Sequence, residues 1–145
     1  MAREYPMSQN RINLEIEIPN QTRYLGLIGN IGEQLARDLS DYPGDHDLLA
    51  YSLNLVLTEA LSNVIKYAGC DSQILRVCIK IEAGTLSIQV HDQGQGFDLD
   101  KLSTAEPEPL SERGRGIFII RQIMDSVDYR KTEDGNVLEM KKRLA

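Results

Sequence analysis

Apolar residues recur along this chain with two different periods, and the order of those periods constrains the fold more than any other feature of the sequence. An apolar residue at every second position predicts a half-buried strand, and one at every third or fourth position predicts an amphipathic helix. The alternating pattern occupies residues 12–18, 75–81, 86–90, 127–129 and 137–142. The helical pattern occupies residues 25–39, 47–67 and a segment that begins near residue 116.

The predicted order is therefore strand, two helices, two strands, helix and two strands. This order favours an α+β fold, a two-layer sandwich in which one mostly antiparallel mixed sheet carries helices on one face. The chain has 145 residues, which is a common size for one domain, so we assign residues 1–145 to a single domain.

Local signals agree with these boundaries. Asp45 or Asp47 can cap the long helix, and Gly69 can end it. The first helix contains three glycines, so it needs support from tertiary packing (Gly26, Gly29, Gly32). Asp134-Gly135 predicts the turn of the last hairpin.

A polar stretch over about residues 97–113 separates the second pair of strands from the last helix. It contains two prolines and five acidic residues. Structureless loops of this length are usually functional lids or disordered segments, and we interpret this one as a lid.

Composition excludes several classes of protein. The net charge of −6 argues against a nucleic-acid binder, which needs a basic face, but leaves room for a site that holds one nucleotide. No apolar run approaches the roughly 18 residues of a membrane span, and Met1 to Gln9 lack the apolar core of a signal peptide. Cys70 and Cys78 match no metal or redox spacing. We expect a cytoplasmic protein that contacts no membrane.

The first of three polar clusters lies on the long helix, at Glu59-Ala-Leu-Ser-Asn63. Glu59 and Asn63 are one turn apart on the same face, and Lys66 follows three residues later. An ordinary solvated face would show the same pattern. The alternative is a site in which the Asn63 amide ligates Mg²⁺ and Glu59 accepts a proton from an attacking hydroxyl.

The second cluster, Asp92-Gln-Gly94-Gln-Gly96, directly follows an apolar strand. A simple turn explains one glycine well and the pair less well. In the functional interpretation, Asp92 accepts a hydrogen bond from an exocyclic amine such as that of adenine. The glycines then let the backbone pass close to the flat base.

The third cluster, Gly114-Arg115-Gly116, opens the last helix. Free N–H groups and a partial positive charge at a helix N-terminus suit phosphates, although a glycine-rich hinge would look the same. The sequence contains neither a Walker loop nor a dinucleotide fingerprint. Together the three clusters predict one site for Mg-ATP.

These segments resemble the motifs of the Bergerat-fold ATPases, which include gyrase, the heat-shock chaperone, sensor histidine kinases and the MutL repair protein. Residues 59–68 resemble the N box, residues 92–97 the first glycine box and residues 114–125 the second. Order and spacing agree over nearly the whole chain. Within the superfamily, the chain is most similar to the anti-sigma-factor serine/threonine kinases of bacterial partner-switching systems.

This resemblance implies a kinase that uses ATP and Mg²⁺ to phosphorylate a STAS-domain anti-anti-sigma protein, and that otherwise sequesters a sigma factor. Members are commonly homodimers. It also implies that Glu59 is the catalytic base, that Asn63 is the Mg²⁺ ligand and that Asp92 reads adenine. The remaining predicted ATP contacts are Lys66, Gly94, Gly96, Arg113, Gly114, Arg115 and Gly116.

Three positions depart from the family pattern. Tyr67 stands where a histidine is common, Arg113 where a further glycine is common, and Gly135-Asn136 where Gly-Thr is usual. Asn136 can still form hydrogen bonds, but the departure puts the support on the adenine side in question. Two alternatives also remain open: a non-catalytic module that binds ATP only to set its shape, and a detached ATP-binding domain of a sensor histidine kinase.

Overall fold

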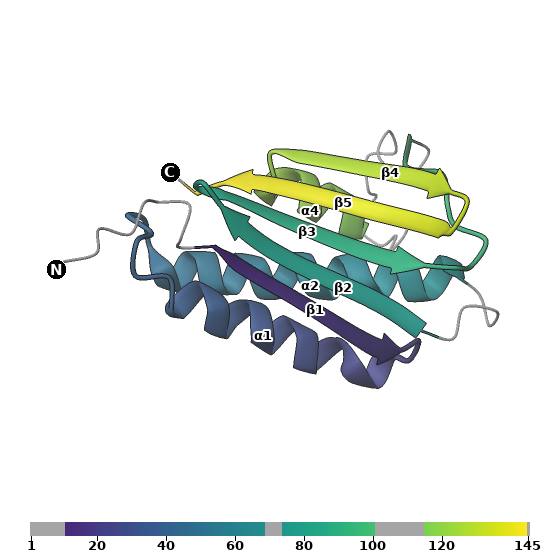
Figure 1. Cartoon of the computed structure of the whole chain (residues 1–145), viewed down its shortest axis with the longest axis horizontal. Coiled ribbons are helices and arrows are strands. Elements are labelled where there is room, and N and C mark those ends of the chain that lie inside the picture. The colour runs from purple at the N-terminus through teal and green to yellow at the C-terminus, as the bar shows by residue number, and fades with distance from the viewer. Residues whose placement is uncertain (1–10, 69–73, 101–114, 145) are drawn as a thin grey trace, which may run out of the picture.

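The computed structural model describes residues 11–68, 74–100 and 115–144. Figure 1 shows one layer of strands with helices behind it. The strands are β1 (Ile12–Pro19), β2 (Ile74–Glu82), β3 (Thr85–Asp92), β4 (Ser126–Thr132) and β5 (Gly135–Arg143). The helices are the short η2 (Thr22–Tyr24), α1 (Leu25–Arg37), α2 (His46–Ala68) and α4 (Arg115–Ile123).

The sheet has the strand order β1-β2-β3-β5-β4. All four pairings of the described strands are antiparallel, so the predicted two-layer α+β fold is confirmed, whereas the expected mixed character is not seen in them. The helices lie on one face of the sheet, and the other face carries no helix among the described residues (Figure 1).

The core fills the space between the two layers. Apolar stripes with a period of two turn toward the helices from β2 and β3 (Leu75, Val77, Ile79, Ile81, Leu86, Ile88 and Val90). Helix α2 lies beneath them and buries nine residues. By length and composition alone α2 could cross a membrane. Its buried residues belong to the core of the described structure.

The glycines of α1 let it pack closely against α2. A Cβ on Gly29 would lie 2.5 Å from Asn54 Oδ1, and one on Gly32 would lie 2.4 Å from Leu57 Cδ1. Tertiary contact therefore supplies the support that this helix needs. At the start of α2, Asp45 Oδ1 accepts hydrogen bonds from the backbone N–H groups of Asp47 (3.0 Å) and Leu48 (3.2 Å), so Asp45 is the cap. The predicted cap Gly69 lies outside the described residues.

The last hairpin differs slightly from its prediction. The turn between β4 and β5 is formed by Glu133 and Asp134, and Gly135 is already the first residue of β5. Gly135 has a φ of +129° and packs against Asp92, where a Cβ would lie 2.3 Å from the Asp92 carbonyl oxygen. This contact brings the start of β5 to the end of β3.

Candidate functional site

Glu59 and Asn63 lie on adjacent turns of α2 and are both half-buried. The Asn63 Nδ2 group donates a hydrogen bond to the Glu59 carbonyl oxygen at 2.8 Å. The amide oxygen is the acceptor end of this group, so a metal ion would bind there and not at the nitrogen.

The first turn of α4 packs directly on these two side chains. A Cβ on Gly116 would lie 2.6 Å from Asn63 Nδ2 and 2.7 Å from Glu59 Oε2. Only glycine allows α4 to begin this close to the carboxylate and the amide. The structure therefore brings together the first cluster and the described part of the third.

Asp92 ends the core-facing stripe of β3 and is only 4% exposed. Its Oδ1 atom accepts a hydrogen bond from the Gly94 backbone N–H at 2.8 Å and another from Asn136 Nδ2 at 3.0 Å. A buried carboxylate needs such donors, because leaving water without them is costly.

The glycine turn after Asp92 connects the second cluster to α2. A Cβ on Gly94 would lie 1.9 Å from the carbonyl oxygen of Ala68, the last residue of α2. Gly96 has a φ of +79°, which favours glycine, and a Cβ there would lie 2.4 Å from the Tyr129 hydroxyl. The second half of α2 therefore carries the first cluster and contacts parts of the second and third.

Two predicted contacts are exposed, and two lie outside the described residues. Lys66 places its ammonium 5.5 Å from the centre of the Tyr67 ring, and Arg115 is the exposed first residue of α4. Arg113 and Gly114 lie outside the described residues, as does most of the predicted lid (residues 101–113). The predictions for these residues stay untested.

Sequence reasoning did not include Asn136 or a group of three aromatic residues among the site residues. The Phe97 ring lies 5.3 Å from the Tyr67 ring and 4.3 Å from the Tyr129 ring. The Tyr129 hydroxyl accepts a hydrogen bond from the Phe97 backbone N–H at 3.3 Å. Burial, with the nearby Asp92 carboxylate, raises the pKa of Tyr129 to about 12, so this hydroxyl stays protonated at neutral pH.

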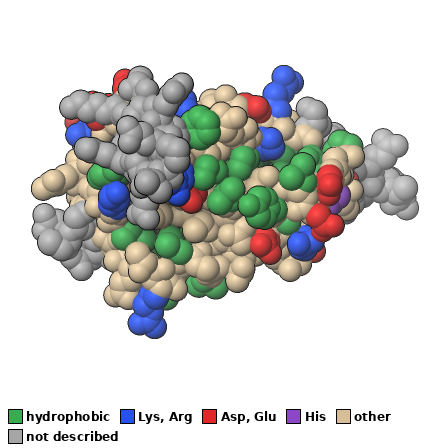
Figure 2. Space-filling model, turned by 180° about the vertical axis from the view of Figure 1, so that it is seen from behind, with side chains coloured by type: hydrophobic (Ala, Val, Ile, Leu, Met, Phe, Trp, Pro, Cys, Tyr) green, Lys and Arg blue, Asp and Glu red, His purple; other side chains and the backbone are tan. Residues whose placement is uncertain are grey.

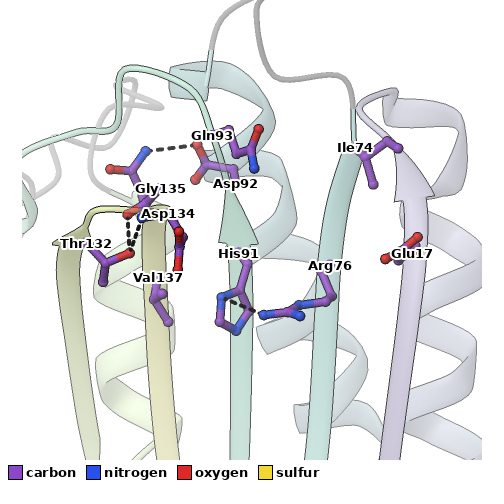
Figure 3. Close-up of a pocket in the computed structure, with 11 residues that line it drawn as sticks. Glu17, Ile74, Arg76, His91, Asp92, Gln93, Thr132, Asp134, Gly135 and Val137 are labelled. Atoms are coloured by element: carbon purple, nitrogen blue, oxygen red, sulfur yellow. Dashed lines mark hydrogen bonds between the residues drawn. The ribbon is translucent and has the colours of Figure 1, made fainter.

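A hollow of about 590 Å³ lies at the same end of the strands, and its lining includes Asp92 and Asn136. Figure 3 shows Arg76, His91 and Val137 on the side of the sheet away from the helices. Arg76 lies 3.5 Å from His91 Nδ1, and burial, followed by Arg76 and Arg130, lowers the pKa of His91. Arg76, His91 and Val137 lie on the uncovered face, whereas Asp92, which also lines the hollow, belongs to the predicted site.

Exposed apolar side chains are most frequent on the helices. Figure 2, seen from the helix side, shows several apolar side chains at the surface. Four of the five large exposed hydrophobic residues are in helices (Leu27, Leu48, Tyr51 and Phe118). Exposed apolar side chains are common on protein surfaces, so exposure alone assigns these residues no role.

A two-layer sandwich with a carboxylate, an amide and glycine turns at one end defines a class of nucleotide-binding fold. The family profile of the histidine kinase-like ATPase domain matches residues 31–142. The chain belongs to this family.

Among curated proteins, the chain is 27% identical to the serine-protein kinase RsbW of Halalkalibacterium halodurans, over 90% of this chain and 83% of that protein. It is also 27% identical to the serine-protein kinase RsbW of Bacillus subtilis, over 83% of this chain and 79% of that protein.

Among solved structures, the chain is similar to the histidine kinase domain of the blue-light-activated histidine kinase of Erythrobacter litoralis. The TM-score is 0.53 at 19% identity. The match covers 88% of this chain, which spans only 62% of that domain, so the likeness concerns the fold.

Proposed function

We propose that this chain is an ATP-dependent protein-serine/threonine kinase that also acts as an anti-sigma factor in a partner-switching system. Its substrate would be a STAS-domain anti-anti-sigma protein, and its second partner a sigma factor. Relatives named as serine-protein kinases, aligned over most of the chain, support the reaction class. We further propose that the protein is cytoplasmic and forms a homodimer.

The observation that carries this proposal is the contact of Gly116 with both Glu59 and Asn63. The start of α4 would present backbone N–H groups and a partial positive charge to the phosphates of ATP. At that point it touches the one carboxylate and the one amide that transfer would need. Phosphoryl transfer depends mainly on positioning and electrostatic stabilisation, which this contact can provide.

In the proposed reaction, Glu59 accepts the proton of the substrate hydroxyl while the oxygen of that hydroxyl attacks the γ-phosphorus. The bond to the oxygen between the β- and γ-phosphorus atoms breaks, and ADP leaves with that oxygen. Lys66, Arg113 and Arg115 would offset phosphate charge. Asp92 would accept a hydrogen bond from the adenine amine, beside the turn made by Gly94 and Gly96.

The donor set fits a magnesium ion that is shared with the nucleotide. Asn63 can offer its amide oxygen to the ion while its nitrogen donates to the Glu59 carbonyl oxygen. Mg²⁺ in such sites takes few protein ligands and relies on phosphate oxygens and water. When bound, the ion would neutralise charge that develops on the phosphates.

The proposal is tested by incubating the purified chain with γ-labelled ATP, Mg²⁺ and a STAS-domain protein. We expect label on the partner, and a loss of at least about 100-fold in the transfer rate for Glu59→Ala, because a general base contributes on that order. Glu33→Ala is a matched control, since Glu33 is also a half-buried glutamate in a helix but bonds Asn54, and it should keep transfer.

Equal labelling by wild type and Glu59→Ala would remove Glu59 from the mechanism. Binding of ATP without any transfer to a STAS protein would instead favour a non-catalytic regulatory module. The two outcomes are distinguished because nucleotide binding is measured separately.

A further inference from the structure

The proposed ATP site is laid out along α2 in a definite order. Its base-reading end lies at the end of the helix, because the turn after Asp92 packs on Ala68 through Gly94. Its reacting end lies at Glu59, where the first turn of α4 meets the helix. Ala68 follows Glu59 by nine positions, which is about 14 Å along the helix axis. The nucleotide would therefore run from the end of α2 toward its middle, with the γ-phosphate beside Glu59.

This order sets the direction from which the acceptor hydroxyl arrives. In an in-line transfer, the attacking and leaving oxygens lie on opposite sides of the γ-phosphorus. The leaving ADP would lie toward the C-terminal end of α2, so the hydroxyl would approach over the N-terminal half of the helix. A folded protein that carries this hydroxyl would then rest on the surface of that half.

A row of apolar side chains lies on that surface, which we call the outer row (Leu48, Tyr51 and Leu55). These residues precede Glu59 by eleven, eight and four positions, so they lie within about 80° of it around the helix axis. Leu48 is 62% exposed, Tyr51 is 66% exposed and Leu55 is half-buried. Figure 2 shows hydrophobic side chains gathered in the middle of the helix side of the molecule. The outer row extends from about 6 to about 17 Å beyond Glu59 along the axis.

The two halves of this helix face suit different ligands. On the C-terminal side of Glu59 the face carries Ser62 and Lys66, which can bond phosphate oxygens. The outer row offers a nucleotide no charge and a single hydroxyl. Exposed apolar groups with polar surroundings instead mark contacts with other proteins, and tyrosine is among the residues that contribute most to such contacts.

We propose that Leu48, Tyr51 and Leu55 form the docking surface for the protein substrate, the partner that carries the acceptor serine or threonine. This inference rests on the proposed kinase function and names the surface that its substrate occupies. The partner would present an apolar patch that begins about 6 Å from its acceptor hydroxyl, as the outer row begins about that far from Glu59.

The test measures phosphoryl transfer from ATP to a STAS-domain protein at varied partner concentration, for the wild-type chain and for Tyr51→Ala. Alanine has the highest helix propensity, so α2 is retained. We expect the KM for the partner to rise about tenfold, because truncation of an aromatic anchor weakens a protein interface by about this factor. The KM for ATP and the rate at saturating partner should stay unchanged.

Leu48→Ala is the second variant, and Leu27→Ala is its matched control. Both remove an exposed leucine from a helix, but Leu27 lies on α1, away from the outer row, and is 52% exposed. Leu48→Ala should raise the KM for the partner by at least about threefold, because a smaller apolar contact is lost. Leu27→Ala should leave this KM unchanged.

An unchanged KM for the partner in both Tyr51→Ala and Leu48→Ala would overturn the inference, and so would an equal rise in Leu27→Ala. A lower rate at saturating partner with an unchanged KM would also overturn it, because Tyr51 would then act on the chemical step. Altered sedimentation of Tyr51→Ala alone, with unchanged transfer kinetics, would assign the outer row to a contact between copies of this chain. A wild-type chain that binds ATP but transfers nothing would refute the proposed function, and this inference with it, before any variant is compared.

Discussion

The two faces of the sheet both carry polar side chains, but they arrange them differently. On the uncovered face, neighbouring strands pair their polar groups with one another: Glu139 accepts hydrogen bonds from Gln89 at 2.6 Å and from Arg130 at 3.1 Å. On the covered face, Glu59 and Asp92 come from distant parts of the chain and lie against glycines with no room for a Cβ. Close approach of glycine backbone to polar groups, rather than the number of those groups, distinguishes the candidate site.

The largest effect is expected where a methyl group would meet backbone. Gly94→Ala places a Cβ 1.9 Å from the Ala68 carbonyl oxygen, so the turn or the end of α2 must move. We expect a loss of about 3 kcal/mol in the free energy of unfolding, measured in urea, together with loss of ATP binding.

Gly26→Ala is the control, since nothing lies within 4 Å of its Cβ. It should be neutral or stabilising by up to about 1 kcal/mol. Equal stability of the two variants would show that the turn is not packed as described.

Gly116→Ala should lower phosphoryl transfer while leaving the stability of the fold nearly unchanged. Its Cβ meets the ends of two flexible side chains, which can move at small cost in stability, but these are Glu59 and Asn63. We expect phosphoryl transfer to fall roughly 10- to 100-fold, because small displacements of reacting groups have effects of this size. Thermal unfolding should stay close to that of Gly26→Ala. Unchanged transfer would contradict a role for this contact.

Asp92→Asn tests the base-reading role directly. The amide can turn an N–H toward the base amine, where the carboxylate offered an acceptor. We expect ATP affinity to fall about ten- to hundredfold while GTP affinity changes less, as measured by competition binding. A preference for ATP equal to that of the wild type would remove Asp92 from base recognition.

The smallest effect is expected on the uncovered face. The pKa of His91 is lowered in the folded state from its ordinary value of 6.5, first by burial and then by Arg76 and Arg130. Between these two pKa values the unfolded chain binds the extra proton, so stability is full above pH 6.5 and falls as the pH drops below it. We expect His91→Gln to reduce this acid-side loss by less than about 1 kcal/mol, because the site is partly open to solvent. Urea titrations at pH 7.5 and 5.5 measure the difference.

Transfer by His91→Gln at pH 7.5 should equal that of the wild type. A marked loss of transfer would mean that the uncovered face takes part in catalysis, and the contrast between the two faces would then be wrong.

The sequence predicted most of the elements because each apolar period is local. The helix over 47–67 is observed at His46–Ala68, and the strand over 75–81 at Ile74–Glu82. The order of strands in the sheet was not predictable in the same way, because the last hairpin could have joined at either edge. Its position beside β3 depends on long-range packing.

The same distinction applies to the site. Glu59 and Asn63 could be paired from their spacing on one helix, and glycines beside Asp92 marked a close backbone approach. Tyr129 carried no such local pattern, and Asn136 was noticed only as a departure from the Gly-Thr pair of the resembling family. Asn136 lies beside Asp92 because β5 pairs with β3, a pairing between distant parts of the chain. Tyr129 is brought there in turn because β4 pairs with β5. The roles of all these residues, and the positions of Arg113 and Gly114, stay predictions.

The central proposal is that three separated segments form one ATP site, and calorimetry of the folded full chain with Mg-ATP tests it most directly. We predict binding at one site per chain, with ATP preferred over GTP. Absence of any binding heat at several temperatures, together with a normal cooperative unfolding transition that added Mg-ATP does not shift, would contradict it.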